Sequence, residues 1–127
     1  MLKLLSGFDH DTVAIRASGV VTGEDYDQEL LPVIEDKLKD HACIKLWYEF
    51  DEAFEGISVG TLWDDAKLGL FHLTDFYRVA FITDSRLVAG MANALAYMIP
   101  CPVKVFERSE TEQALLWMKE SETSETV

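Results

Sequence analysis

Hydrophobic positions recur with strand-like and helix-like periods in turn along the whole chain. Residues 2–5 predict a short strand and residues 12–21 alternate as in a half-buried strand, so we expect the two to pair as a hairpin. Residues 22–25 have the pattern of a capping box with aspartate in place of glutamate, which opens a helix. The core-facing stripe of that helix consists of Tyr26, Leu30, Val33, Ile34 and Leu38.

Pro32 interrupts this stripe. Proline has no backbone N–H to donate, so one hydrogen bond of the helix cannot form. We therefore expect either a kink near residues 28–31 or a restart of the helix with Pro32 in its first turn.

Strands and helices continue to alternate in the rest of the chain. Residues 42–50 are almost continuously apolar and aromatic, which is typical of a strand buried on both faces of a parallel sheet. A flexible acidic loop is expected over residues 51–56, and Ser58 caps a predicted helix over residues 58–73. The later elements are a strand at 78–83, a helix at 86–98, a strand at 103–106 and a final helix. A capping box at 109–112 opens the final helix. Its inner side consists of Ala114, Leu115, Trp117 and Met118.

This order of elements, ββαβαβαβα, predicts an α/β fold with a five-stranded, mostly parallel sheet and about four helices. A chain of 127 residues is long enough to bury a complete core. We expect a single domain over residues 1–120. Residues 121–127 are polar and acidic and predict a disordered tail.

Composition narrows the range of functions. The 23 acidic residues against 11 basic ones give a formal charge of −12, which disfavours nucleic acid as a partner. There is no secretory signal pattern at the start, and the uncharged run over residues 87–103 is too short for a membrane span and contains Pro100 and Pro102. Cys43 and Cys101 fit no metal pair or disulfide framework, so we expect two buried thiols and a cytoplasmic protein, with peripheral membrane contact left open.

A literal G-x-S-x-G motif at residues 56–60 raises the question of a hydrolase. The acidic loop separates the motif from the preceding strand, and His72 would lie about 20 Å away along the same helix, at 1.5 Å per residue. Neither His10 nor His41 has a partner at helical spacing that would build a metal site. We therefore predict no catalytic residue, no metal and no cofactor.

Two predicted helices have more apolar surface than docking on a sheet requires. Leu68 and Phe71 fall outside the core stripe of the helix at 58–73, and the helix at 86–98 has no charge after its first position. For the latter helix we expect a core stripe of Leu87, Val88, Met91, Leu95 and Met98 and an outer side of Ala89, Gly90, Asn93, Ala96 and Tyr97. Either the two helices pack together over the sheet, or they meet a ligand, a membrane or a second copy of the chain.

The chain resembles the SpoIIAA-like family, also described as STAS/SEC14 domain proteins. The resemblance lies in residues 22–26, 31–35, 54–56, 63–65, 68–69, 105–106 and 112–114 with Trp117. It implies a non-enzymatic domain related in fold both to the phosphorylation-regulated anti-sigma-factor antagonists and to the lipid-carrying CRAL-TRIO domains. We predict an apolar or lipid-like ligand and a homodimer, with contacts through Trp63, Leu68, Phe71, Met91, Tyr97 and Met98.

The resemblance also implies an alternative function. The antagonists are phosphorylated on a serine at the start of the helix after the third strand, and Ser58 falls at that place. Their Asp-Ser-Ser/Thr-Gly pattern is absent, because Ile57 precedes Ser58 and Val59 follows it. The alternative is a regulatory STAS module that binds a protein partner and is switched at Ser58.

Overall fold

The computed structural model describes residues 1–57, 75–97 and 101–119. Its main sheet has five strands in the order β1-β2-β4-β6-β7, with β1 antiparallel to β2 and the other pairs parallel. This confirms the predicted α/β class, the terminal hairpin and the mostly parallel sheet. The strands are β1 (Leu2–Leu4), β2 (Thr12–Ala17), β4 (Ile44–Phe50), β6 (Phe76–Ile82) and β7 (Val103–Phe106).

The prediction of one strand over residues 12–21 was wrong, because the chain leaves the main sheet after Ala17. Gly19 takes the left-handed backbone conformation, with φ at 60°, which redirects the chain at little steric cost. The next residues form β3 (Val20–Val21), which pairs in parallel with β5 (Gly56–Ile57) as a small second sheet. Gly56 has a backbone φ of 149°, which residues other than glycine rarely adopt.

The acidic loop before β5 is held in place by main-chain hydrogen bonds. The Gly19 amide donates to the Ala53 carbonyl at 2.9 Å, and the Glu55 amide donates back to the Gly19 carbonyl at 2.8 Å. The Asp51 amide donates to the Ala17 carbonyl at 3.1 Å. The loop over residues 51–56 thus has a hydrogen-bonded backbone path, and its flexibility stays a prediction.

The first helical segment changes its winding near Pro32. It comprises α1 (Gly23–Asp25), a π-helical turn η1 (Tyr26–Leu30) and α2 (Leu31–Asp40), with Pro32 in the first turn of α2. The Leu31 amide donates to the Tyr26 carbonyl five residues earlier. The predicted restart of the helix is confirmed, and the π-helical turn is how the chain passes the missing proline donor.

The capping box that opens this segment is also confirmed. The Asp25 amide donates to Thr22 Oγ1 at 3.2 Å, and the Thr22 amide donates to Asp25 Oδ2 at 2.9 Å. The second predicted box, over residues 109–112, was two residues too late. In the structure the Glu107 amide donates to Glu110 Oε1 at 2.8 Å, ahead of a 3₁₀ turn η3 (Arg108–Glu110) and the final helix α6 (Thr111–Lys119).

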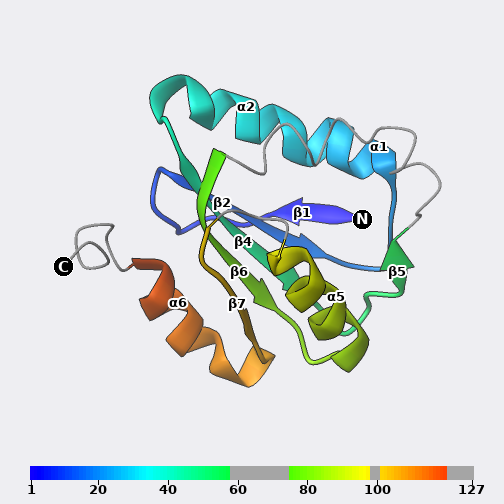
Figure 1. Cartoon of the computed structure of the whole chain (residues 1–127). Helices are drawn as coiled ribbons and strands as arrows, with labels where there is room; N and C mark the ends of the chain where they lie inside the picture. The colour runs from blue at the N-terminus through cyan, green and yellow to red at the C-terminus, as the bar shows by residue number, and fades with distance from the viewer. Residues whose placement is uncertain (58–74, 98–100, 120–127) are drawn as a thin grey trace.

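Helices cover both faces of the sheet (Figure 1). The helices α2 and α5 (Arg86–Ala96) pack on one face, where Ile34 and Val88 join the larger core cluster. The other face carries α6, whose Ala114, Trp117 and Met118 pack on Ala14, Trp47, Ala80 and Ile82. The predicted inner sides of the first and last helices are confirmed.

Two buried cations hold the end of α6 against the sheet. Lys45 Nζ donates to the Met118 carbonyl at 2.5 Å, and an Arg78 guanidinium N–H donates to the Trp117 carbonyl at 2.7 Å. The last carbonyls of a helix lack partners within the helix and carry partial negative charge. Lys45 and Arg78 therefore supply hydrogen-bond donors to two of the last carbonyls of α6.

The predicted inner stripe of α5 was partly wrong. Val88 and Ala92 are buried, whereas Leu87 is 75% exposed and Met91 is 49% exposed. The helix has no charge after Arg86 that would mark its outer side, so its apolar pattern fits two orientations about its axis. The expectation of two buried thiols was also wrong, since Cys43 is exposed and Cys101 is half-buried.

Candidate functional site

A cavity of about 530 Å³ opens at the carboxyl ends of β4 and β6. Tyr26 of η1 lines one side, α5 lines the opposite side, and the loop after β4 forms part of the rim. Figure 1 shows these elements around that end of the sheet. In open parallel sheets, ligands characteristically bind outside the carboxyl ends of the strands.

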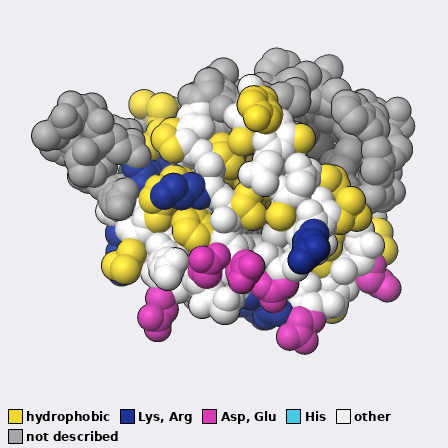
Figure 2. Space-filling view, turned by 60° about the horizontal axis from the view of Figure 1, so that its bottom comes forward, with side chains coloured by type: hydrophobic (Ala, Val, Ile, Leu, Met, Phe, Trp, Pro, Cys, Tyr) yellow, Lys and Arg dark blue, Asp and Glu magenta, His cyan; other side chains and the backbone are white. Residues whose placement is uncertain are grey.

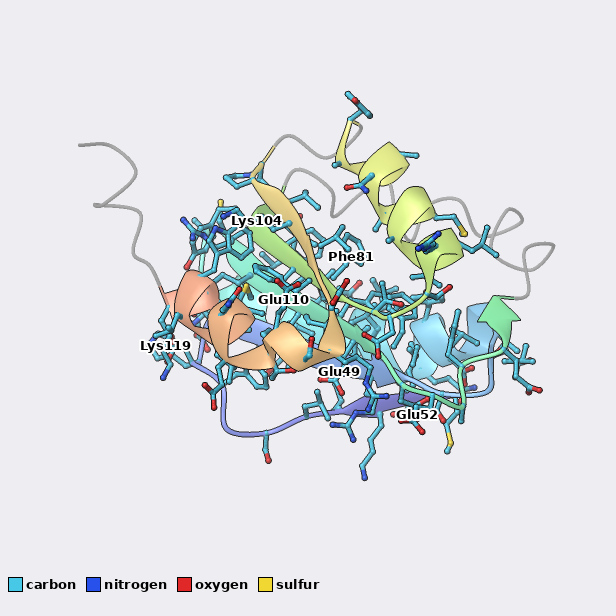
Figure 3. The ribbon with its side chains drawn as sticks, turned by 90° about the horizontal axis from the view of Figure 1, so that it is seen from below. Glu49, Glu52, Phe81, Lys104, Glu110 and Lys119 are labelled. Carbon is cyan, nitrogen blue, oxygen red and sulfur yellow. The ribbon has the colours of Figure 1, made fainter. Side chains whose placement is uncertain are left out.

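Aromatic rings form the sheet side of the cavity. Tyr48 and Phe50 are two residues apart on β4, so both project from the same face, and their rings stack with centroids 4.4 Å apart at an angle of 7°. Phe54 meets Phe50 edge-on at 4.8 Å, and Phe81 of β6 lies 5.9 Å from Tyr48. Figure 3 shows Phe81 between the sheet and α5.

Two tyrosine hydroxyls meet at the cavity wall. The hydroxyl oxygens of Tyr26 and Tyr48 lie 2.5 Å apart and form a hydrogen bond. Burial raises the pKa of Tyr48 well above its ordinary value, and Tyr26 and Asp25 raise it further. Burial also raises the pKa of Tyr26, although the hydrogen bond with Tyr48 lowers it. Both phenols are therefore neutral at neutral pH and act as polar points in an apolar wall.

The wall contributed by α5 is aliphatic. It consists of Leu87, Val88, Met91 and Ala92, the first and third of which also face solvent. The start of α5 is fixed by side-chain oxygens. The Val88 amide donates to Ser85 Oγ at 3.3 Å, and the Ser85 amide donates to Thr83 Oγ1 at 3.0 Å.

Charged side chains lie around the rim. Asp51, Glu52, Glu55, Asp84 and Arg108 all line the opening. Arg108 is engaged twice: its guanidinium lies 3.3 Å from Glu52 Oε1, and its backbone amide donates to Asp84 Oδ1 at 2.9 Å. Glu52 lies on the loop after β4, away from Phe81 (Figure 3).

The structure describes only part of the predicted contact set. Met91 lines the cavity, whereas Tyr97 is 94% exposed and does not line it. Ser58, Trp63, Leu68, Phe71 and Met98, the helix over 58–73 and the tail over 121–127 lie outside the described residues. Their roles in ligand contact and phosphorylation stay predictions, as does the homodimer.

Sequence reasoning missed the aromatic wall as a site. Tyr26 was expected in the core, and Tyr48, Phe50 and Phe81 were counted only as strand residues. A usable signal was present: β4 and the strand beside it both place aromatic residues near their carboxyl ends. In a parallel sheet those ends share one edge.

Two histidines from distant parts of the chain lie side by side. His10 and His41 stack with ring centroids 4.8 Å apart, and His10 Nδ1 lies 3.2 Å from His41 Nε2. Across residues 1–57, 75–97 and 101–119, no group of three or more His, Cys, Asp or Glu side chains could hold a metal ion. None of the helices in those ranges is long and apolar enough to span a bilayer.

Comparison with known proteins identifies the family of the chain. No curated protein matches it significantly. The crystal structure of an uncharacterized DUF3478-family protein with a SpoIIAA-like fold, from Shewanella loihica PV-4, is similar at a TM-score of 0.69 and 29% identity, over 92% of this chain and 93% of that one. The SpoIIAA-like family model matches residues 12–119. The match spans nearly all of the sheet and helices described above, and the chain belongs to the SpoIIAA-like family.

Proposed function

We propose that this SpoIIAA-like chain is a binding protein that holds an apolar small molecule in the cavity between β4, β6 and α5. The observation that supports the proposal is a cavity of about 530 Å³ with a wall of stacked aromatic rings. Sites for small ligands usually have roughly 300–1,000 Å³ and are mostly apolar with a few fixed polar groups. The paired hydroxyls of Tyr26 and Tyr48 supply such groups here.

The exposed part of α5 supports the same function. Leu87 and Met91 line the cavity, Leu87 largely exposed and Met91 about half exposed, so a ligand that covered them would gain about 25 cal/mol for each Å² of apolar surface buried. The unbranched thioether of Met91 adapts to ligands of different shape. A lipid-like chain is therefore a suitable ligand.

The test is a variant that fills the cavity. Met91→Trp should reduce binding of decanol, measured by titration calorimetry, at least about tenfold, because the larger ring occupies the space of the ligand. Asn93→Trp is the matched control, since Asn93 is exposed on the same helix and does not line the cavity. Wild-type protein that does not bind decanol, or equal affinity in both variants, would overturn the proposal.

Native mass spectrometry of gently purified protein distinguishes the proposal from the regulatory alternative. Bound apolar ligand adds a mass that organic solvent removes. Phosphorylation at Ser58 adds a covalent mass that remains after denaturation. The second result without the first would favour the protein-interaction module.

A further inference from the structure

The rim of the cavity is strongly negative. Asp51, Glu52, Glu55 and Asp84 supply four carboxylates against the one guanidinium of Arg108, which leaves a formal charge of −3. The chain as a whole carries −12, so the long-range field has the same sign. On the face shown in Figure 2, acidic side chains gather in a row beside hydrophobic ones.

The single cation of the rim is poorly placed to receive an anion. The Arg108 guanidinium already lies 3.3 Å from Glu52, and Asp84 accepts a hydrogen bond from its backbone amide. A ligand carboxylate at Arg108 would compete with Glu52 for the guanidinium and would meet the negative charge of the other carboxylates that line the cavity. Like charges in a partly desolvated site repel one another and lower affinity.

A ligand cation meets the opposite situation. Within the described chain no cationic side chain pairs with Glu55, so its carboxylate is open to an incoming charge. Below the rim, the rings of Tyr48, Phe50 and Phe54 pack on one another and form an apolar wall for the tail of such a ligand. An acidic rim above an apolar cavity suits a ligand that has a cationic head and an apolar tail.

We infer that the ligand of this cavity is an organic cation, an ammonium group carried on an alkyl or aryl tail. The tail occupies the space between the aromatic wall and α5, and the nitrogen lies at the rim near Glu55 and Asp84. This inference rests on the proposed function and adds the charge of the ligand to it. Fatty acids and anionic lipids are excluded as preferred ligands by the same charges.

Three probes with the same tail test the inference. Decyltrimethylammonium, decanol and decanoate are titrated into the intact protein by calorimetry below their micelle-forming concentrations, at about 10 mM and about 150 mM salt, where the Debye length falls from about 30 to about 8 Å. The ammonium should bind at least about tenfold more tightly than decanoate at low salt, with decanol between them. The difference should shrink at the higher salt, because the rim charges are partly exposed.

Variants locate the charge preference. Glu55→Gln with Asp84→Asn should weaken ammonium binding about fivefold or more and strengthen decanoate binding, while the amide at position 84 keeps an oxygen for the Arg108 amide. Glu35→Gln with Asp36→Asn removes the same net charge from exposed positions on α2 and should change little.

The outcomes separate the two proposals. Equal binding of all three probes, tighter binding of decanoate, or equal effects of the two double variants would overturn the inference and leave apolar binding standing if Met91→Trp still blocks it. Binding of none of the probes would overturn both. A preference for the ammonium that survives in both double variants would place the charge recognition elsewhere and overturn the assignment to this rim.

Discussion

The hydroxyl of Tyr48 on the sheet and the hydroxyl of Tyr26 on the π-helical turn form a single hydrogen bond across the buried edge of the cavity. Each phenol therefore satisfies the other, and the bond joins β4 to the first helical segment. A buried polar group that loses its partner costs more than the bond itself contributes.

Removing both hydroxyls should therefore cost less than the sum of the two single losses. Tyr48→Phe alone should lower the free energy of unfolding by about 1–2 kcal/mol, because it leaves the Tyr26 hydroxyl buried without its partner. Tyr48→Phe with Tyr26→Phe should cost clearly less than the sum of the single changes in urea denaturation. Tyr97→Phe, at an exposed position, should stay within about 0.5 kcal/mol of wild type. Additive costs would show that the hydroxyls are not coupled.

The anchoring of α6 gives a second prediction. Lys45→Met keeps most of the side-chain volume but removes the ammonium that meets the Met118 carbonyl. It should lower the free energy of unfolding by about 2 kcal/mol, as expected for a hydrogen bond from a charged donor. Hydrogen exchange should then be faster in α6 than in β4. The exposed Lys39→Met on α2 is the control, and an equal effect of the two substitutions would contradict the anchoring role.

Acid should weaken the fold partly through Asp11. Burial raises the pKa of this carboxyl, but the hydrogen bond from the Tyr77 hydroxyl and the charge of Lys45 outweigh it, so the net pKa is lowered. A folded-state pKa below the unfolded value means that the contribution of Asp11 is complete above about pH 4 and is lost as the pH falls through the folded pKa. Asp11→Asn should flatten the acid limb of the curve of unfolding free energy against pH, whereas the exposed Asp36→Asn should not. Parallel curves for wild type and Asp11→Asn would refute this.

The two thiols should differ in reactivity. Burial raises the pKa of Cys101 to about 11, with Arg78 lowering it and Cys43 raising it, so only about one in a thousand side chains is thiolate at pH 8. Cys43 is exposed. Iodoacetamide at pH 8, followed by peptide mapping, should modify Cys43 at least about tenfold faster. Equal rates in the folded protein would contradict the burial of Cys101, and equal rates in urea serve as the control.

Local rules were enough to predict several elements. The boundaries of β7 and the box formed by Thr22 and Asp25 follow from residues close together in sequence. The restart at Pro32 follows from the chemistry of one residue. Such features depend on neighbours within one turn, and those neighbours are visible in the sequence.

The features that failed depend on contacts between distant segments. Lys45 and Arg78 read as ordinary strand positions, because their partners are carbonyls more than 35 residues later. The helical spacing of Leu87 and Met91 fits an inner, core-facing stripe. Only the docking of α5 on the sheet decides which of its apolar sides is buried. The cavity is formed by η1, two strands, a loop and α5. Each element could be predicted from the sequence, but their arrangement around one cavity could not.

The π-helical turn has a consequence for chain length. Between Tyr26 and Leu31 the backbone holds one residue more than an α-helical turn would. If the intact segment wound as a regular α-helix with α2 kept in place, everything before Leu31 would rotate by about 100° from its position in the structure. Tyr26 would then point away from Tyr48. The regular helix and the closed tyrosine wall are therefore mutually exclusive for this chain, and the insertion of a single residue decides between them.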